Sequence, residues 1–501
     1  MPGAQRRFLI LGLDGGTFDL LDPLMDAGDL PFLKSMVRSG VRAPLMSVYP
    51  AKTIPAWYSM ATGQDPGQLG IYGFTEPNGG PGHSKLVQTF RPAEAMWDRL
   101  SRLGMKVGVV NFPLHQGYPL HGFVVPGMFT EQPKTYPTDL RAELERTLGG
   151  PYPPELPVHR ESERASWIAI ATRSVEQRAK IAAALAEHHR PDFMFAMFRE
   201  TDRLEHQYWS ELMRPVAEIP EDLRTFWRTV DAACRTVHEA FRAIGGPEIT
   251  LVVSDHGHGE NQSDFFTNRW LAEEGFLAFR EGGDVGGRNL LARILLWTQR
   301  RRVGRALALP IAGMLRKGRG EGLGQLLSGA TSFEEMAERI DWHRTLAYSY
   351  PVPEGIYLNR RNPEVTAATE AALVARLRAR LEAYSDARVE VFDPAEIYRG
   401  RNFVRAPSLL IRVDGMRTEP RMDFSYPRPL IRDRPQFFYG CGNHRMNGIL
   451  IGAGDGVRPG ATDDGPLSLL DVAPTVLEGM GVSPSPAMNG RSFGRRLGLA
   501  A

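Results

Sequence analysis

The sequence predicts an α/β protein with a mainly parallel central sheet flanked by helices, and an inserted basic helical cap. Short apolar segments that are typical of strands buried on both faces recur along the chain. Longer segments with helical patterning lie between them, and parallel neighbours need such crossover helices. The chain has 501 residues, which is more than one ordinary core needs.

The expected strands are short and strongly apolar. They are RFLILGL (7–13), KVGVVNF (106–112), DFMFAMF (192–198), ITLVVSD (249–255) and NGILIGAG (447–454). Helices are expected over 161–189 and 221–243. In open α/β sheets ligands bind at the carboxyl ends of the strands, so polar residues there are the first candidates for a site.

One region departs from this alternation. Residues 285–319 contain eight arginines, one lysine and no acidic residue, with apolar residues at helical spacing. We therefore divide the chain into a first core part (1–279), an inserted helical cap (280–340) and a second core part (341–501). The basic face of the cap is expected to be solvated or packed on the core. The alternatives are a lid for an anionic ligand and a helix on a membrane surface.

Composition narrows the classes of partner and compartment. The net charge of +2 gives no electrostatic reason to expect a nucleic-acid polymer. Two cysteines, Cys234 and Cys441, fit a reducing compartment without excluding a periplasm. The first apolar run is shorter than the roughly 7–15 residues of a signal peptide, and no run approaches the roughly 18 of a membrane span. We expect a soluble cytoplasmic protein, and the oligomeric state stays open.

Carboxylates and imidazoles follow three of the expected strands, and one more histidine lies shortly before a fourth. They are Asp14, Asp202, His206, Asp255, His256 and His444. Each has an ordinary alternative, such as a helix N-cap, a surface helix pair or a solvated turn residue. Together, three carboxylates and three imidazoles at one sheet edge form the ligand set of two zinc-like ions.

The segment GLDGGTFD suggests a different ligand, because it follows a strand and opens a helix as a dinucleotide fingerprint would. The G-x-G-x-x-G spacing is absent, however, and Asp14 would place its charge where a pyrophosphate should lie. We therefore favour the metal hypothesis.

A nucleophile candidate lies in the segment 47–74. Thr53 stands between Lys52 and Ile54-Pro55, in a loop expected to open a helix. A helix N-terminus presents free N–H groups and a partial positive charge to an anion. The alternative is that Thr53 is a plain N-cap.

Aromatic residues cluster around these positions. They are Trp57, Tyr58, Tyr72, Phe74, Tyr208 and Trp209. They could form the wall of an apolar pocket for the second ester group of a phosphodiester. The alternative is core packing, the usual location of aromatic side chains.

Taken together, these segments resemble the alkaline phosphatase superfamily and, within it, the type I phosphodiesterase/nucleotide pyrophosphatase family. The matching segments are LGLDGG, YPAKTIPAWYSMATGQDPGQLGI, ETDRLEHQYW, VVSDHGHG, FFTNRWLAEEGFL and GNHRMNGILIGAG followed by SLLDVAPTVLEGMGV. They occur in the family's order over nearly the whole chain.

The resemblance implies a role for each matching residue. Asp202, His206 and His444 resemble the ligands of one metal ion, and Asp14, Asp255 and His256 those of the other, with Thr53 as the nucleophile that touches this second ion. Zn²⁺ is the first expectation, with Mn²⁺ or Mg²⁺ as alternatives. His258 matches no ligand position, and we expect it to be a pocket or structural residue.

The chain departs from the family near the nucleophile. Leu69-Gly70 stands where many relatives carry His-Gly, and Ala56 where nucleotide pyrophosphatases often have an asparagine. Asn111 is a candidate replacement amide, and Lys52 and Trp57 are further candidate substrate contacts.

The implied function is metal-dependent hydrolysis of small phosphate esters through a phospho-threonine, with diesters or nucleotide pyrophosphates as the first expectation. Phosphomonoesterase or phosphomutase activity and a catalytically inactive metal-binding protein are the alternatives.

Overall fold

The structure is a computed structural model that describes residues 6–78, 81–87, 93–114, 117–127, 134–152, 156–157, 159, 163–283, 337–424, 428–432, 440–460 and 466–499. The basic stretch 285–319, on which the cap hypothesis depends, lies outside the described residues. The division of the chain at 279 and 340 stays a prediction.

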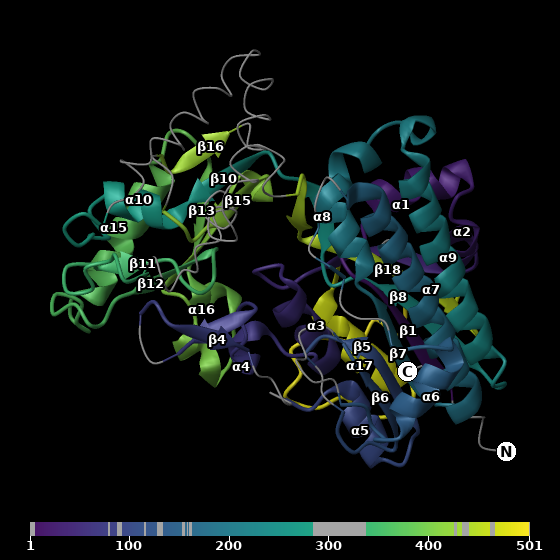
Figure 1. The fold of residues 1–501 in the computed structure, drawn as a ribbon. Coiled ribbons are helices and arrows are strands. Elements are labelled where there is room, and N and C mark those ends of the chain that lie inside the picture. Colours follow the sequence, from purple (N-terminus) through teal and green to yellow (C-terminus); the bar gives the residue numbers. More distant parts are fainter. Residues whose placement is uncertain are drawn as a thin grey trace.

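A central eight-stranded sheet confirms the predicted α/β class (Figure 1). Its order is β19 (Leu467–Ser468), β2 (Val41–Met46), β18 (Asn447–Gly454), β8 (Glu248–Val253), β1 (Arg7–Leu13), β7 (Phe193–Phe198), β5 (Val107–Phe112) and β6 (Gly122–Pro126). All five expected strands are present, whereas β2, β6 and β19 were not predicted. The pairings make β18 antiparallel to both of its neighbours, and the other seven strands share one direction.

Helices cover both faces of this sheet, which explains why its strands are apolar throughout. Side chains alternate along β1, so that Leu9, Leu11 and Leu13 enter one core and Phe8 and Ile10 the other. The first core is covered by α1 (Phe18–Ala27), α2 (Pro31–Ser39), α7 (Arg164–His189), α8 (Glu200–Leu212) and α9 (Glu221–Arg242). The second is covered by α3 (Thr53–Thr62), α5 (Met96–Arg102) and α17 (Val472–Gly479).

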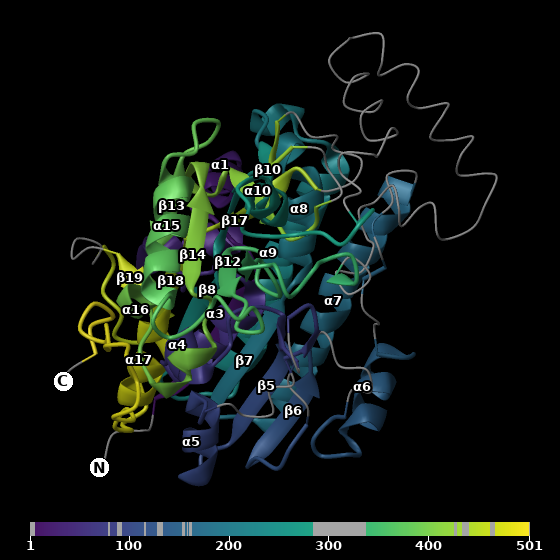
Figure 2. The ribbon, with the colours of Figure 1, turned by 90° about the vertical axis from the view of Figure 1, so that its left-hand side faces the viewer.

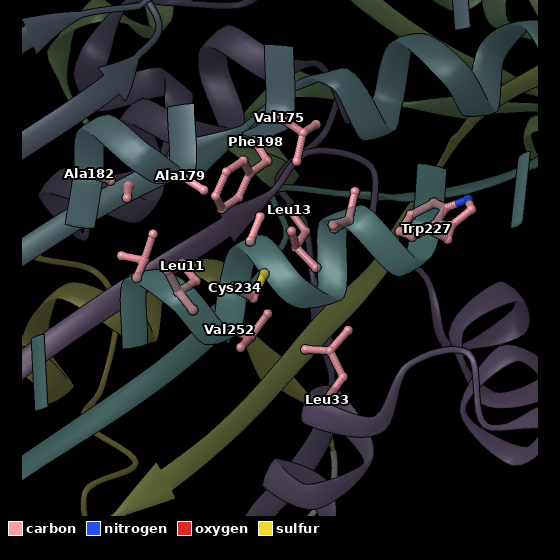
Figure 3. Close-up of a cluster of buried hydrophobic side chains, with 14 of the residues drawn as sticks. Leu11, Leu13, Leu33, Val175, Ala179, Ala182, Phe198, Trp227, Cys234 and Val252 are labelled. Carbon is pink, nitrogen blue, oxygen red and sulfur yellow. The ribbon is translucent and has the colours of Figure 1, made fainter. Parts of the chain in front are cut away.

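The first core is built from side chains of distant segments. Figure 3 shows Leu11 and Val252 of the sheet beside Ala179 of α7 and Cys234 of α9. The two long helices α7 and α9 confirm the predictions over 161–189 and 221–243, apart from their first or last residues.

A second, smaller sheet stands beside the central one (Figures 1 and 2). Its strands are β10 (Ser263–Phe266), β11 (Ala347–Tyr348), β12 (Gly355–Leu358), β13 (Val389–Phe392), β14 (Leu409–Val413), β15 (Thr418–Arg421) and β16 (Leu430–Arg432). It has its own apolar core, to which α10 (Thr267–Glu273) and α15 (Glu370–Glu382) contribute. We call this unit, residues 263–283 and 337–432, the small lobe. The sequence did not predict it.

The remaining described α-helices and β-strands are short. They are α4 (Pro66–Leu69), α6 (Leu140–Leu148), α16 (Pro394–Ile397), and the pairs β3 (Thr75–Pro77) with β4 (Ser84–Leu86) and β9 (Gly257–Glu260) with β17 (Gly442–Arg445). None of the described helices combines the length and apolarity needed to cross a membrane.

The strand directions bring the predicted site residues to one edge. Leu13 pairs with Phe198, and Gly12 with Val253, so β1, β7 and β8 end side by side. Because β18 runs the opposite way, the residues before it lie at the same edge as the residues after the others. That reversal places His444 beside the carboxylates that follow β1 and β8.

Candidate metal centre

The six predicted ligands come together at this edge, and five of them are buried. Asp14 follows β1, and Asp255 and His256 follow β8. The N-cap of α1 is Thr17, so the N-cap alternative for Asp14 is wrong. The alternative that His256 is solvated in a loop is also wrong, because no part of its side chain is exposed.

One group of donor atoms comes from α8 and β17. Asp202 and His206 are four residues apart on α8, which puts both side chains on one face of the helix. Asp202 Oδ1 lies 3.3 Å from His206 Nε2 and 3.3 Å from His444 Nε2. The two imidazole Nε2 atoms are 3.0 Å apart. These three atoms form a nearly equilateral triangle.

A second group lies beside it, between β1 and β8. His256 Nε2 is 3.2 Å from Asp255 Oδ2 and 3.6 Å from Asp14 Oδ1. The His256 and His444 rings stack with centroids 3.7 Å apart, so the two groups adjoin. The six residues can also be assigned to the two ions in another way, because donor atoms of Asp202, His256 and His444 likewise lie within 4.8 Å of one another.

Backbone carbonyls determine the tautomer of all three imidazoles. Nδ1 of His206 lies 2.9 Å from the Gly442 oxygen, and Nδ1 of His444 lies 2.6 Å from the Ala51 oxygen. Nδ1 of His256 lies 3.1 Å from the Gly257 oxygen. A carbonyl only accepts, so each Nδ1 must donate, and the neutral ring keeps its Nε2 lone pair for a metal ion.

The spacing and the unmet polar atoms both fit divalent cations. Two ligands bound at about 2.0–2.1 Å in a tetrahedral site are about 3.3 Å apart. The measured separations of 3.0–3.6 Å bracket that value. Buried atoms at the centre have no hydrogen-bond partner, among them Asp14 Oδ1, Asp202 Oδ1, Asp255 Oδ2 and His256 Nε2. All four accept rather than donate, which is the requirement of a cation.

The electrostatics lead to the same conclusion. Burial, followed by repulsion from Asp255 and Asp202, raises the pKa of Asp14 well above its usual range. Burial and the charge of Asp202 do the same to the pKa of Asp255. Burial would also raise the pKa of Asp202, but His206 and His444 bring it well below its usual value. Buried carboxylates that repel one another are costly unless a positive charge joins them.

Thr53 lies in the loop that adjoins the centre. The loop leaves β2 at the same sheet edge, and His444 bonds to Ala51 two residues before Thr53. Thr53 is buried and is the first residue of α3, whereas Lys52 occupies the N-cap position. The alternative that Thr53 is a plain N-cap is therefore wrong.

The small lobe reaches this loop through an ion pair. Lys52 Nζ lies 2.8 Å from Glu354 Oε1, and both side chains are largely buried. Burial would lower the pKa of Lys52, but Glu354 raises it. This contact gives Lys52 a structural partner that the sequence did not reveal.

The prediction that aromatic residues form the wall of a substrate pocket is largely wrong. Trp57, Tyr58, Tyr208 and Trp209 are buried in the two cores of the central sheet. Trp57 packs edge-on against Phe195 and is fully buried. Sequence spacing could not separate a pocket wall from core packing.

Asn111 is engaged within the protein. Its amide donates to the Met197 oxygen at 3.2 Å, and its oxygen accepts from Arg178 at 2.9 Å and from the Tyr152 hydroxyl. Arg178 also forms a buried ion pair with Glu200 at 2.6 Å. These bonds tie β5, β7, α7 and α8 together.

Two further residues at the centre were not predicted as ligands. Glu205 precedes His206 on α8, and His258 lies in β9 directly opposite His444 of β17. Both are fully buried. His258 is close in sequence to the predicted ligand His256, but no sequence pattern indicated that Glu205 faces His258.

The comparisons with known proteins agree with this geometry. The family model described as type I phosphodiesterase/nucleotide pyrophosphatase matches residues 8–414. No curated protein matches the chain. Similar solved structures include an inactive variant of murine ectonucleotide pyrophosphatase/phosphodiesterase 5 in complex with AMP, with 13% identity, a TM-score of 0.55 and coverage of 99% of this chain and 100% of that chain.

A second structure is phosphonoacetate hydrolase from Sinorhizobium meliloti in complex with phosphonoformate, with 15% identity and a TM-score of 0.53. It covers 95% of this chain and 96% of that chain. At these identities the two structures show a shared fold.

Proposed function

The chain belongs to the type I phosphodiesterase/nucleotide pyrophosphatase family, a metal-dependent family of phosphoryl hydrolases, and on this premise we propose that it hydrolyses small phosphate esters at a two-metal centre through a covalent intermediate on Thr53. The observation that carries the proposal is the convergence of three carboxylates and three imidazoles in two groups, in which neighbouring donor atoms lie 3.0–3.6 Å apart.

The donor set divides into two sites under this proposal. Asp202, His206 and His444 would hold one divalent ion. Asp14, Asp255 and His256 would hold the other. Mixed nitrogen and oxygen donors favour Zn²⁺, with Mn²⁺ and Mg²⁺ as alternatives. Bound divalent ions would lower the pKa of the attacking hydroxyl and offset the charge of the phosphoryl group.

Thr53 is the proposed nucleophile. Its Oγ forms a bond to phosphorus while the bond from phosphorus to the leaving oxygen breaks. The hydroxyl proton of Thr53 passes to solvent water, and the leaving alkoxide takes up a proton from solvent water to become the alcohol. Water then attacks phosphorus, releases Thr53 and yields the cleaved phosphate. The first turn of α3 presents backbone N–H groups and partial positive charge toward the phosphoryl oxygens.

Lys52 takes a positioning role in this scheme. Its ammonium group is held by Glu354 of the small lobe, so it orients the loop that carries Thr53. The partners of Asn111 likewise make it a support for α8. Neither residue is needed as a phosphate contact.

The substrate class rests on the family. Phosphodiesters or nucleotide pyrophosphates are the first expectation, and one similar structure holds AMP. The aromatic pocket no longer supports that preference, because most of its residues lie in the core. The deciding measurement is kcat/KM for bis-p-nitrophenyl phosphate against p-nitrophenyl phosphate at equal metal loading. A ratio of ten corresponds to about 1.4 kcal/mol of transition-state binding, and a ratio below one would indicate a monoesterase or mutase.

Thr53→Ala tests the covalent step. It should abolish turnover and leave metal content unchanged, whereas Thr53→Ser should keep part of the rate. Thr62 of the same helix gives a matched control: it is buried, and its hydroxyl donates to the Tyr58 oxygen at 2.7 Å. Thr62→Ala should keep kcat. Wild-type kcat in Thr53→Ala would refute the phospho-threonine route. Absence of turnover in the metal-loaded wild type on every ester would favour an inactive binding protein.

The compartment remains part of the proposal. Cys234 and Cys441 are free and buried, which supports a cytoplasmic location with a small-molecule substrate.

A further inference from the structure

A third group of nitrogen and oxygen donors lies away from the candidate metal centre. It consists of Glu143 on α6 and of His188 and His189, the last two residues of α7. One donor atom from each of the three lies within 4.8 Å of the other two. β7 begins at Phe193, shortly after His189, and runs toward the candidate metal centre. The group therefore lies at the opposite edge of the central sheet and shares no residue with that centre.

Two adjacent imidazoles contact the two oxygens of one carboxylate. His188 Nδ1 lies 2.8 Å from Glu143 Oε1, and His189 Nε2 lies 3.2 Å from Glu143 Oε2. Adjacent residues of an α-helix point about 100° apart, so two neighbouring side chains seldom reach the same group. Here one ring presents its near nitrogen and the other its far nitrogen. Both separations are close to the value of about 3.3 Å expected between two ligands of one zinc ion.

Packing holds two of the three donors in place. The Glu143 and His189 side chains are only 19% and 24% exposed. The His189 ring packs against Phe123 of β6, with ring centroids 5.0 Å apart. His188 is 75% exposed and closes the group on the solvent side. A cation could therefore enter from solvent and meet donors that have already lost part of their side-chain entropy.

The local charges favour a cation. The last turn of α7 carries the partial negative charge of a helix C-terminus, and the carboxylate of Glu143 adds a full one. Arg190 follows His189, but its guanidinium donates to the Ile244 oxygen at 2.7 Å and is engaged there. Without a cation, the group forms only two imidazole–carboxylate hydrogen bonds, and partly exposed pairs of that kind contribute little stability.

We propose that Glu143, His188 and His189 form a peripheral divalent-cation site that joins α6 to the end of α7. Two imidazoles and one carboxylate are a ligand set that zinc uses in proteins, so Zn²⁺ is the favoured ion, with water completing its coordination. The ion would receive the lone pairs of His188 Nδ1 and His189 Nε2, and the neutral rings would carry their protons on the other nitrogens. The site is independent of the proposed hydrolysis, because it shares no residue with the two-metal centre.

The test is zinc stoichiometry. Metal-free protein is dialysed to equilibrium against a fixed free concentration of Zn²⁺, and bound zinc is measured by elemental analysis. The deciding quantity is the difference from the wild type, since the candidate metal centre also binds ions. His188→Ala, Glu143→Ala and the double variant should each bind one equivalent fewer than the wild type, because all three remove the same ion. Glu187→Gln is the matched control: Glu187 is exposed on α7 beside His188 but belongs to none of the donor groups, and this variant should bind as much zinc as the wild type.

A second measurement follows the link between the two helices. Zn²⁺ should slow the hydrogen exchange of the α6 amides in the wild type and in Glu187→Gln. It should leave the exchange of α6 unchanged in His188→Ala. Folding does not confuse this comparison, because most of the His188 side chain is in solvent.

Each other outcome overturns the site. Equal zinc in the wild type and His188→Ala, or equal effects of Zn²⁺ on their α6 exchange, would mean that the group is only hydrogen-bonded. A loss of zinc in Glu187→Gln as well would indicate unspecific attraction by negative charge, and a loss of two equivalents in the double variant would indicate two separate ions. Turnover should be unchanged in His188→Ala, and a loss of turnover together with zinc would place the missing ion in the two-metal centre. A wild type without turnover would refute only the proposed hydrolysis, since the difference in zinc could still be measured.

Discussion

Replacing Asp255 by asparagine should change stability in opposite directions with and without metal. Asp255 Oδ1 accepts from the Gly15 N–H at 3.3 Å, and Oδ2 faces His256 Nε2 at 3.2 Å. Asparagine keeps an oxygen for Gly15. Its NH₂ group can donate toward His256 Nε2 or Asp14 Oδ1, which both lack a partner. The change also removes a ligand and a negative charge.

The expected magnitudes follow from these contacts. Without metal, the variant should be more stable than the wild type by about 1–3 kcal/mol, the cost of one unmet buried polar group. With free metal at about 1,000 times its Kd, each ion stabilises the wild type by about 4 kcal/mol, and the variant should lose one such contribution. Turnover should fall with the missing ion.

The assay is urea unfolding followed by tryptophan fluorescence, in EDTA and in excess Zn²⁺. Asp231→Asn is the control, because Asp231 is buried, accepts from the Phe32 and Leu33 N–H groups at the start of α2, and belongs to neither group of candidate ligands. It should destabilise the protein by about 1 kcal/mol in both buffers. An Asp255→Asn variant that is less stable than the wild type in EDTA, or equally stabilised by Zn²⁺, would refute the metal assignment.

Two further predictions concern stability away from the ligands. Arg178→Ala leaves Glu200 buried without its ion-pair partner and should lower the free energy of unfolding in urea by about 3–5 kcal/mol. Arg173→Ala, on the exposed side of the same helix, should change it by about 0.5 kcal/mol at most. Equal effects of the two substitutions would contradict the stabilising role of the Arg178–Glu200 pair. Burial would raise the pKa of Asp29, but two arginines of α9 bring it below its usual value. The ion pairs of the Asp29 carboxylate therefore stabilise the folded protein above about pH 4, and this stabilisation is lost as the pH falls through the folded-state pKa. Asp29→Asn should therefore cost about 1 kcal/mol at pH 7 and progressively less below pH 4, and a cost that does not vary with pH would refute this.

The strands and their polar ends could be predicted because they depend on local pattern. An apolar run followed by a carboxylate, as in ITLVVSD, marks both a buried strand and a strand end. Five strands of the central sheet were predicted from their apolar runs. The three others were missed: β2 has an alternating burial pattern and contains a proline, and β19 has only two residues.

The roles of residues beside the site depended on packing that no local pattern records. Trp57 has the same spacing in the chain whether it lines a pocket or fills a core, and only the helix orientation placed it against Phe195. Lys52 was expected near a phosphate, but Glu354, three hundred residues away in the chain, neutralises it. The small lobe that carries Glu354 was not predicted at all.

The sequence by itself determined the α/β class, the family resemblance and the six residues of the candidate metal centre, because ligand types at strand ends are a local signal. Only the tertiary structure decided how they meet. The antiparallel direction of β18 places His444 beside Asp202, and backbone carbonyls from distant loops orient each imidazole. The Glu205–His258 pair likewise exists only because β9 crosses the face of α8. Such contacts join residues far apart in the chain, and their geometry is determined by strand direction and packing, which residue spacing does not encode.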